Sequence, residues 1–171
     1  MTGNAATTFL SKITEQDGIE TRTMPTGRMH SNTMTRADND MFHHLNNPIY
    51  GVLIDSIINA YLMERCGYST SKSDRIGLVA NTYCDYFGSA QYPGVLDVGL
   101  RVVKLGKSSV MYECGIFQGG EEQVKAVGGF IQIWVTRADN RPAADGIEPH
   151  LRDQLAKLVN SADSEVVKPK L

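Results

Sequence analysis

The chain has 171 residues, of which 42% are hydrophobic and 21% are charged, a balance typical of one ordinary globular domain. Its 17 Lys and Arg against 19 Asp and Glu give a formal net charge of -2, which leaves no global positive field to attract nucleic acid.

The cysteines, Cys66, Cys84 and Cys114, form no CxxC pair and no short Cys/His spacing for zinc. We therefore expect reduced thiols, no metal and a cytoplasmic protein. The longest apolar stretch, 49–63, is interrupted by polar residues and is shorter than the ~20 residues of a membrane span, so we expect no membrane insertion.

The two ends of the chain differ from its middle in composition and pattern. Residues 1–25 are rich in Thr, Ser, Gly and Asn without clear periodicity, which predicts a loosely held leader. Residues 26–160 are predicted to form a single domain, and 161–171 to form a frayed tail. Apolar residues at helical spacing predict a helix within 147–159, and these are Ile147, Leu151, Leu155 and Leu158.

The strongest helix signal lies at 48–66. Asn47 is a suitable N-cap, a proline occupies the first helical position, and Gly67 suits the C-terminal stop. Apolar residues occupy most of the circumference, so we expect this helix to be covered on nearly every side. Asp55 and Asn59, four residues apart, form its one polar stripe.

After this helix the hydrophobic period changes from helical to alternating. Four strands are predicted within 76–90, 95–106, 108–119 and 122–138, and an earlier long strand within about Thr23 to Arg36. The turns between the strands are too short for parallel crossovers, so antiparallel pairing is expected. The pattern predicts an α+β fold in which one sheet, with the four later strands in a meander, curls around one central helix.

The densest cluster of reactive side chains lies between Arg36 and Tyr50, in the connection that leads into the central helix. A helix N-terminus offers unpaired backbone N–H groups and partial positive charge, so it can stabilise an oxyanion. Asp38 or Asp40 nearby supplies a carboxylate. A carboxylate together with an oxyanion donor is sufficient for hydrolysis.

The motif in this segment reads Asp38-Asn39-Asp40, then His43-His44, then Asn46-Asn47, with Tyr50 following. Here the sequence resembles the hotdog-fold acyl-CoA thioesterases, in particular the 4-hydroxybenzoyl-CoA thioesterase-like branch. The resemblance extends from about residue 33 to 137 and includes the turn at 106–113 and the final strand at 128–135. It implies a hotdog fold, a curved antiparallel sheet wrapped around a long central helix.

The resemblance also implies roles for individual residues. Asp40 is the expected catalytic carboxylate, as nucleophile or as general base, and the backbone N–H of Asn47 is expected to polarise the thioester carbonyl. His44 matches a motif residue and is the third residue placed in the catalytic group, where it could act on the leaving thiolate or orient the loop. Tyr50 and Asp55 are assigned to the substrate pocket.

Two alternatives concern the carboxylates. Asp40 could simply close an Asx turn or cap the helix, because aspartate is common in turns for local reasons. Asp55 is a rival catalyst, since other hotdog thioesterases carry their acidic residue on the central helix; paired with a neighbour such as Asn59, it would instead be a supporting group.

Binding of coenzyme A requires cations for its phosphates. By the resemblance, these phosphates are expected at the turn that carries Lys104, Lys107, Ser108 and Ser109. No separate cofactor is expected, because coenzyme A is part of the substrate. The resemblance implies a homodimer, or a pair of such dimers, with active sites at the subunit interface. Two other functions stay open: a hotdog enoyl-CoA hydratase or dehydratase, and a non-catalytic acyl-CoA binding or sensing protein.

Overall fold

The computed structural model describes residues 29–159, with side chains from residue 33 onward. Its elements in chain order are β1 (Met29–Thr33), the short 3-10 helix η1 (Arg36–Asp38), α2 (Asn47–Glu64), β2 (Arg75–Tyr86), β3 (Val95–Leu105), β4 (Ser109–Gln118), β5 (Val124–Thr136) and α3 (Pro149–Ala156). The helix predicted within 147–159 and the four strands predicted after the central helix are confirmed. The predicted leader of residues 1–25 and the tail of 161–171 lie outside the described residues, as does the first part of the strand predicted from Thr23 to Arg36.

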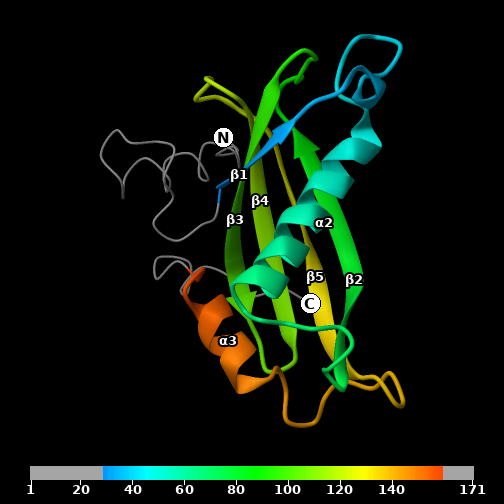
Figure 1. Cartoon of the computed structure of the whole chain (residues 1–171), viewed down its shortest axis with the longest axis vertical. Coiled ribbons are helices and arrows are strands. Elements are labelled where there is room, and N and C mark those ends of the chain that lie inside the picture. The colour runs from blue at the N-terminus through cyan, green and yellow to red at the C-terminus, as the bar shows by residue number, and fades with distance from the viewer. Residues whose placement is uncertain (1–28, 160–171) are drawn as a thin grey trace, which may run out of the picture.

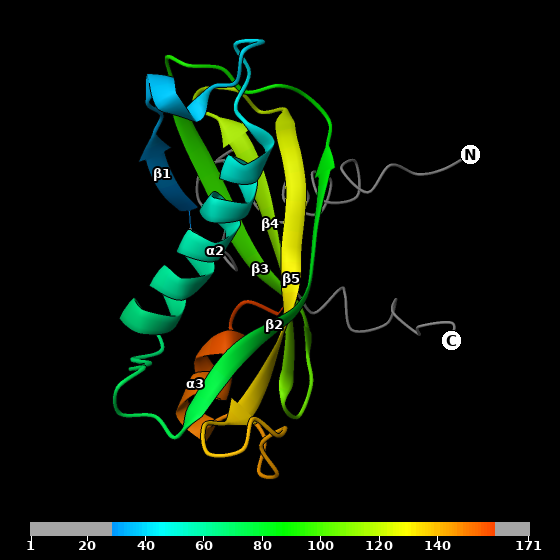
Figure 2. The same ribbon diagram turned by 90° about the vertical axis from the view of Figure 1, so that its right-hand side faces the viewer.

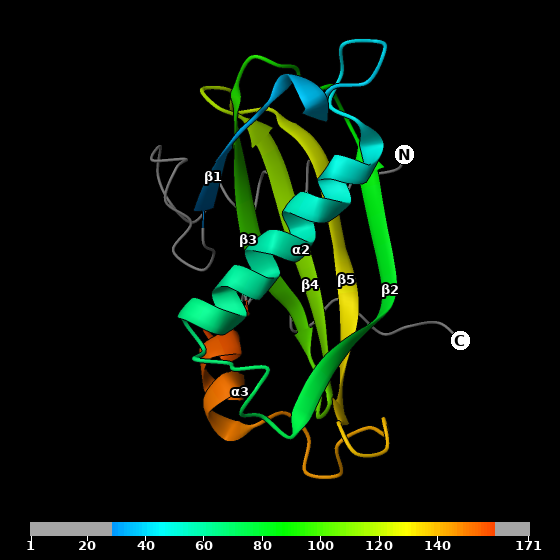
Figure 3. The same ribbon diagram turned by 45° about the vertical axis from the view of Figure 1, so that its right-hand side comes forward.

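The five strands form one antiparallel sheet in the order β1-β3-β4-β5-β2. The sheet curves around α2, which runs obliquely across one of its faces from the end where β2 finishes (Figures 1 and 3). Turned by 90°, the same ribbon shows α2 on one side of the sheet only (Figure 2). The predicted α+β fold, with one curved antiparallel sheet around a central helix, is therefore confirmed.

The prediction of a four-strand meander was wrong in one respect, because β2 pairs with β5 and not with β3. The register runs from Arg75 opposite Thr136 to Tyr86 opposite Ala126. The connection 87–94 then carries the chain across the end of the sheet to β3. The strands before and after α2 in sequence, β1 and β2, take the two opposite edges of the sheet that packs against one face of the helix. Only β3, β4 and β5 form the predicted meander.

The ends of α2 differ slightly from the prediction. The helix begins at Asn47, so Asn46 and not Asn47 is the N-cap, and its side chain makes no capping hydrogen bond. Asn46 is extended, with φ -64° and ψ 134°, which suits the residue that enters a helix. At the other end Gly67 has φ +65°, and the N–H of Tyr68 donates to the carbonyl of Leu62 at 2.9 Å. The predicted glycine stop is confirmed, since glycine adopts this left-handed conformation without the penalty of a Cβ.

The expectation that α2 is covered on nearly every side was wrong for this chain. One face packs into the core, with these buried residues: Tyr50, Leu53, Ile54, Ile57, Ile58, Tyr61 and Leu62. The opposite face stays exposed, including Val52 at 57% and Met63 at 55%. The reason is geometric, because the sheet lies on one side of the helix (Figure 2). None of the helices in residues 29–159 is long and apolar enough to cross a membrane.

The two ends of the sheet carry different loops (Figure 1). The connection between η1 and α2 lies at the end where β2 finishes and β3 begins. The turn between β3 and β4 lies at the opposite end, beside α3, where Ile147 donates its N–H to the carbonyl of Lys107 and Arg152 donates to the carbonyl of Gly106. The segment 146–152 therefore holds this turn in place.

Candidate active site

The first aspartate of the motif, Asp38, serves the local backbone. It ends η1, and its Oδ2 accepts hydrogen bonds from the N–H and the hydroxyl of Thr35, at 2.6 and 3.0 Å. This is a reciprocal cap of a short helix, which satisfies an N–H that the helix leaves unpaired. The Asp38 carbonyl in turn accepts the N–H of Asn46 at 2.8 Å, which brings the connection back to the start of α2.

The second aspartate, Asp40, opens a tight turn. Its Oδ1 accepts the N–H groups of Phe42 at 2.8 Å and of His44 at 3.1 Å, while its own N–H donates to the His44 carbonyl at 2.8 Å. His43 completes the turn at φ +64°, a conformation that only a few per cent of non-glycine residues adopt. The Asx turn considered for Asp40 is therefore present. It uses Oδ1, and within the described residues Oδ2 accepts no hydrogen bond.

Asp40 also lines a cavity of about 340 Å³. The loop and the start of α2 contribute Asp40, His44, Leu45, Asn47 and Tyr50, and the end of β2 with the following residues contributes Tyr86, Phe87, Gly88 and Ser89. The fold thus brings all three residues predicted to be catalytic, and one of the two predicted for the substrate pocket, into a single cavity. The Asx turn and the position at the cavity are compatible, because the turn uses only one of the two carboxylate oxygens.

The N-terminus of α2 offers one N–H to this cavity. Pro48 has none, and the N–H of Ile49 donates to the Asn46 carbonyl at 2.9 Å. The N–H of Asn47 has no acceptor in the described part of the chain, as is usual in a first helical turn that no side chain caps. Since Asn47 lines the cavity, this N–H and the positive end of the helix dipole are available to an oxygen atom there.

Two tyrosines form an aromatic wall. The rings of Tyr50 and Tyr86 meet edge to face, with centroids 5.1 Å apart. Burial raises the pKa of Tyr50, although the backbone of Ala90 lowers it in part. The pKa of Tyr86 is raised to about 12, chiefly by burial and also by its hydrogen bond with Cys84. Both phenols are therefore protonated near neutral pH and can donate hydrogen bonds.

Asp55, the other residue assigned to the pocket, lies further along α2 on its exposed face. Its Oδ2 accepts a hydrogen bond from the Asn59 amide at 2.9 Å, the pairing considered in the sequence analysis. It does not line the cavity of a single protomer.

The four residues assigned to coenzyme A lie toward the far end of the sheet, in the β3–β4 turn and the adjoining ends of these strands, and are Lys104, Lys107, Ser108 and Ser109. Ser109 is opposite Ile133 on β5, whereas Tyr86 at the cavity is opposite Ala126. Seven residues of extended strand, at about 3.3 Å each, separate these levels by roughly 23 Å. One protomer therefore does not bring this turn to the Asp40 cavity.

The sequence analysis did not single out Gly88 and Ser89, which line the cavity. They follow β2 directly, in the connection 87–94, and Gly88 donates its N–H to the Lys125 carbonyl at 3.1 Å. The sequence carries a weak signal for a turn at these two positions, because glycine and serine after a run of alternating apolar residues are typical of a turn. That this turn lies beside the Asp40 loop depends on β2 taking the sheet edge beside the start of α2.

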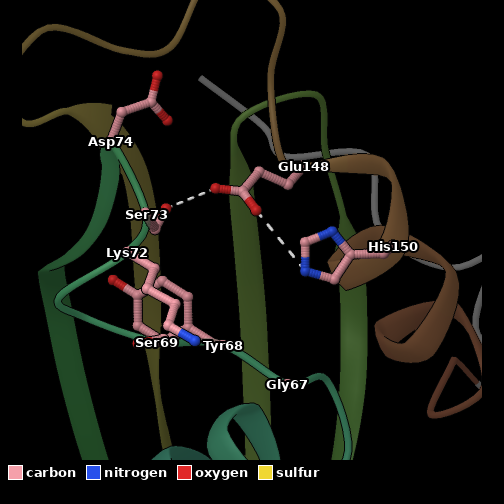
Figure 4. A pocket seen from close by; sticks show the side chains of 8 residues that line it. All are labelled: Gly67, Tyr68, Ser69, Lys72, Ser73, Asp74, Glu148 and His150. Atoms are coloured by element: carbon pink, nitrogen blue, oxygen red, sulfur yellow. Dashed lines mark hydrogen bonds and ion pairs between the residues drawn. The ribbon is translucent and has the colours of Figure 1, made fainter.

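A second cavity, of about 260 Å³, lies at the opposite end of the molecule and is lined by Gly67, Tyr68, Ser69, Lys72, Ser73, Asp74, Glu148 and His150. Figure 4 shows Glu148 between Ser73 and His150. Ser73 donates to Oε1 of Glu148, and Nε2 of His150 lies 3.6 Å from its Oε2. Because the carboxylate and not the imidazole faces the hydroxyl, this arrangement is not a nucleophile with its base. We therefore take the Asp40 cavity as the candidate active site.

Comparisons with known proteins agree with the fold. The family model of the thioesterase superfamily matches residues 42–125, beginning two residues after Asp40. No curated protein matches the chain. Among solved structures, the PA5185 protein of Pseudomonas aeruginosa is 38% identical, with a TM-score of 0.74, and the alignment covers 78% of this chain and 92% of that one.

Two more distant structures have the same fold. A 1,4-dihydroxy-2-naphthoyl-CoA thioesterase from Synechocystis is 14% identical, with a TM-score of 0.70 over 77% of this chain and 97% of that one. A thioesterase from Thermus thermophilus, solved with coenzyme A and zinc, is 22% identical, with a TM-score of 0.62 over 76% and 92% of the two chains. The family match, the 38% identity over most of both chains and the curved sheet around α2 lead to one conclusion. The chain belongs to the thioesterase superfamily and has the hotdog fold.

Proposed function

We propose that this protein is an acyl-CoA thioesterase, which hydrolyses a thioester to a carboxylic acid and free coenzyme A. The observation that carries the proposal is that the Asp40 carboxylate and the N-terminus of α2 line one cavity. A thioester needs a group that activates or replaces water and a donor for the oxyanion that develops on its carbonyl. Asp40 and the Asn47 N–H have these two capacities.

In the proposed reaction the thioester carbonyl oxygen accepts a hydrogen bond from the Asn47 N–H, and the helix dipole adds to the stabilisation of the oxyanion. With Asp40 as general base, its carboxylate accepts a proton from water as the water oxygen attacks the carbonyl carbon. The C–S bond then breaks and the proton passes to the departing thiolate. With Asp40 as nucleophile, Oδ2 attacks instead, the thiolate leaves, and water hydrolyses the resulting anhydride. Both routes use the oxygen that the Asx turn leaves unoccupied.

His44 contributes to the proposed site through its backbone. Its N–H donates to Oδ1 of Asp40 at 3.1 Å and its carbonyl accepts the Asp40 N–H at 2.8 Å, so it fixes the direction of the carboxylate. The residue is exposed and also lines the cavity. Because its hydrogen bonds with Asp40 are made by backbone atoms, we assign His44 to the shape of the turn rather than to proton transfer.

Coenzyme A as the thiol carrier is supported by the names of related structures. The Synechocystis protein is described as acting on a naphthoyl-CoA ester, and the Thermus thermophilus protein was solved with coenzyme A. A Staphylococcus aureus protein with 13% identity and a TM-score of 0.69 was also solved with coenzyme A. Tyr50, Tyr86 and Phe87 give the cavity an apolar wall for the acyl group. We propose a cytoplasmic enzyme, where acyl-CoA esters and reduced thiols coexist.

The proposed active form is a homodimer formed through β2. This strand lies at the edge of the sheet, and its middle, 78–82, is exposed. A long edge with exposed apolar residues such as Leu78 and Val79 is a template for another strand. A second copy of β2, paired antiparallel about a two-fold axis through this stretch, would continue the sheet and bring the exposed face of α2 toward its counterpart.

Such a dimer would resolve the separation between the cavity and the coenzyme A residues. Antiparallel pairing sets the start of β2 in the partner subunit beside the end of β2 in the first. The β3–β4 turn lies at the same end of the sheet as the start of β2. The cavity of the other subunit would then lie near Lys104, Lys107, Ser108 and Ser109. The two lysines would bind the phosphates of coenzyme A, and the thioester would lie at Asp40.

The test is release of free thiol from aromatic and C2 to C18 acyl-CoAs, and from matching acyl carrier protein esters, by wild type, Asp40→Asn and Asp55→Asn. We expect wild-type turnover, a loss on the order of a hundredfold or more for Asp40→Asn, and nearly full activity for Asp55→Asn. Tight acyl-CoA binding by folded wild type without thiol release would contradict the proposal and favour a binding protein. Loss of activity in Asp55→Asn alone would move the catalyst onto α2.

The dimer is tested separately by sedimentation of wild type and of Val79→Lys, since a lysine on an edge strand opposes pairing. We expect a wild-type dimer, and for the variant a folded monomer with little activity. A fully active wild-type monomer would refute the interface.

A further inference from the structure

The residue between the two aspartates, Asn39, joins the loops on both sides of the Asp40 cavity. Its side-chain Nδ2 donates to the carbonyl of His43 at 3.0 Å, inside the Asp40 turn. Its Oδ1 accepts the N–H of Tyr92 at 3.3 Å, in the connection 87–94. Asn39 also forms an isolated antiparallel bridge with Leu45, at the base of the same turn. The Nδ2 and Oδ1 atoms of one partly buried amide are therefore both hydrogen-bonded, and each bonds to a different loop.

Both of these loops line the cavity. The turn from Asp40 to His44 provides the carboxylate, and the connection 87–94 provides Phe87, Gly88 and Ser89. The backbone joins the two loops at one other point near the turn, where the Leu45 N–H donates to the Ala90 carbonyl at 2.8 Å. The turn itself extends beyond this point, and its tip is exposed, with Met41 at 84%. The tip therefore has little packing to fix it.

We propose that Asn39 is a positioning residue, which holds the Asp40 carboxylate at a fixed place relative to the far wall of the cavity and to the N–H of Asn47. This inference rests on the proposed thioesterase function. Without the amide, the turn keeps the hydrogen bonds that Asp40 itself makes, but it loses the bond to the His43 carbonyl and the link to Tyr92, so it can swing about its base. Catalysis depends on the placement of the reacting groups, and a displacement of about 1 Å can cost roughly a hundredfold in rate. Binding of coenzyme A, which uses other residues, is not affected.

The chain offers a matched control in Gln118 on β4. Its amide also makes two hydrogen bonds with the connection 87–94, to the N–H and the carbonyl of Gln91, both at 3.0 Å. It holds the same loop from its other side and does not contact the Asp40 turn. Gln118→Ala therefore removes a comparable restraint on the loop and leaves the link to Asp40 in place.

The experiment measures kcat and KM for acyl-CoA with Asn39→Ala, the size-matched Asn39→Leu and Gln118→Ala, and amide hydrogen exchange across 38–46. For both Asn39 variants we expect kcat to fall about 10- to 100-fold with KM within about threefold of wild type, and faster exchange at the amides of the turn. Gln118→Ala should keep kcat within about threefold.

Three results would overturn the inference in an active wild-type background. These are an unchanged kcat in both Asn39 variants, an equal loss in Gln118→Ala, or a loss that appears in KM and not in kcat. An inactive wild type would overturn the proposed function itself, and the assignment of Asn39 with it, so the two failures are distinguishable.

Discussion

Replacing Asn47 by proline removes a single backbone N–H, the one proposed to bind the oxyanion. The local structure accommodates the change. Proline favours the first turn of a helix, and Asn46, with φ -64° and ψ 134°, already has the extended conformation that a residue before proline adopts. The N–H that is lost has no acceptor in the described chain, so little stability is lost with it. Removal of one oxyanion donor costs about 10²- to 10³-fold in kcat, or about 2.7–4 kcal/mol of transition-state stabilisation.

The assay is steady-state thiol release, with circular dichroism and thermal unfolding to establish that the variant is folded. Asn47→Ala is the matched control, because it removes the side chain and retains the N–H. We expect the alanine variant to stay within several-fold of wild type while the proline variant loses two to three orders of magnitude, as a single donor predicts. A folded Asn47→Pro protein with wild-type kcat, or an equal loss in both variants, would refute the assignment of the backbone N–H.

Two further predictions concern stability. A Cβ at Gly129 would overlap the carbonyl oxygen of Tyr112 on the neighbouring strand, so Gly129→Ala should lower the free energy of unfolding by about 3 kcal/mol or more in denaturant titrations. Gly88→Ala is the control, because a Cβ at Gly88 meets only the Lys125 Cδ, at 3.4 Å. An equal loss of stability in Gly88→Ala would contradict this reasoning. Burial raises the pKa of the Cys66 thiol to about 11, because the folded protein favours the neutral thiol over the thiolate. The resulting contribution of Cys66 to the free energy of unfolding is complete below the unfolded pKa of about 9 and is lost as the pH rises to 11. Stability measured from pH 8 to 11 should therefore fall less steeply in Cys66→Ala than in wild type, and identical slopes would count against it.

The local parts of the active-site loop could be predicted from sequence because they depend on near neighbours. The two aspartates, the histidine pair and the proline at the start of α2 lie within one short segment, and the turn and the helix start that they form are local structures. Even so, the sequence did not distinguish the two carboxylates by itself. The structure separates them, since Asp38 caps η1 through Thr35 whereas Asp40 lines the cavity and uses only Oδ1 in its turn.

The far wall of the cavity could not be predicted in the same way. Gly88 and Ser89 are distant in sequence from Asp40, and they meet it because β2 pairs with β5 at the edge of the sheet. Nothing in the alternating pattern of β2 specifies its neighbour, since alternation reports only that a strand has two different faces. The assignment of Lys104 and Lys107 shows the same limit. Their residue types suit phosphate binding, but only strand register places the turn beside them roughly 23 Å along the sheet from the cavity.

The helices and strands of this protein could be predicted from its sequence, because helix caps, hydrophobic period and turn residues act over a few positions. A long central helix, four later strands and a connecting loop before the helix were predicted, and all are present in the structure. The neighbours of each strand, the buried face of α2 and the residues that complete the cavity around Asp40 became known only from the folded chain. These arrangements depend on how the sheet covers the apolar face of the helix, since burial of apolar surface lowers the free energy of the folded state. That burial is a property of the whole chain and not of any one segment.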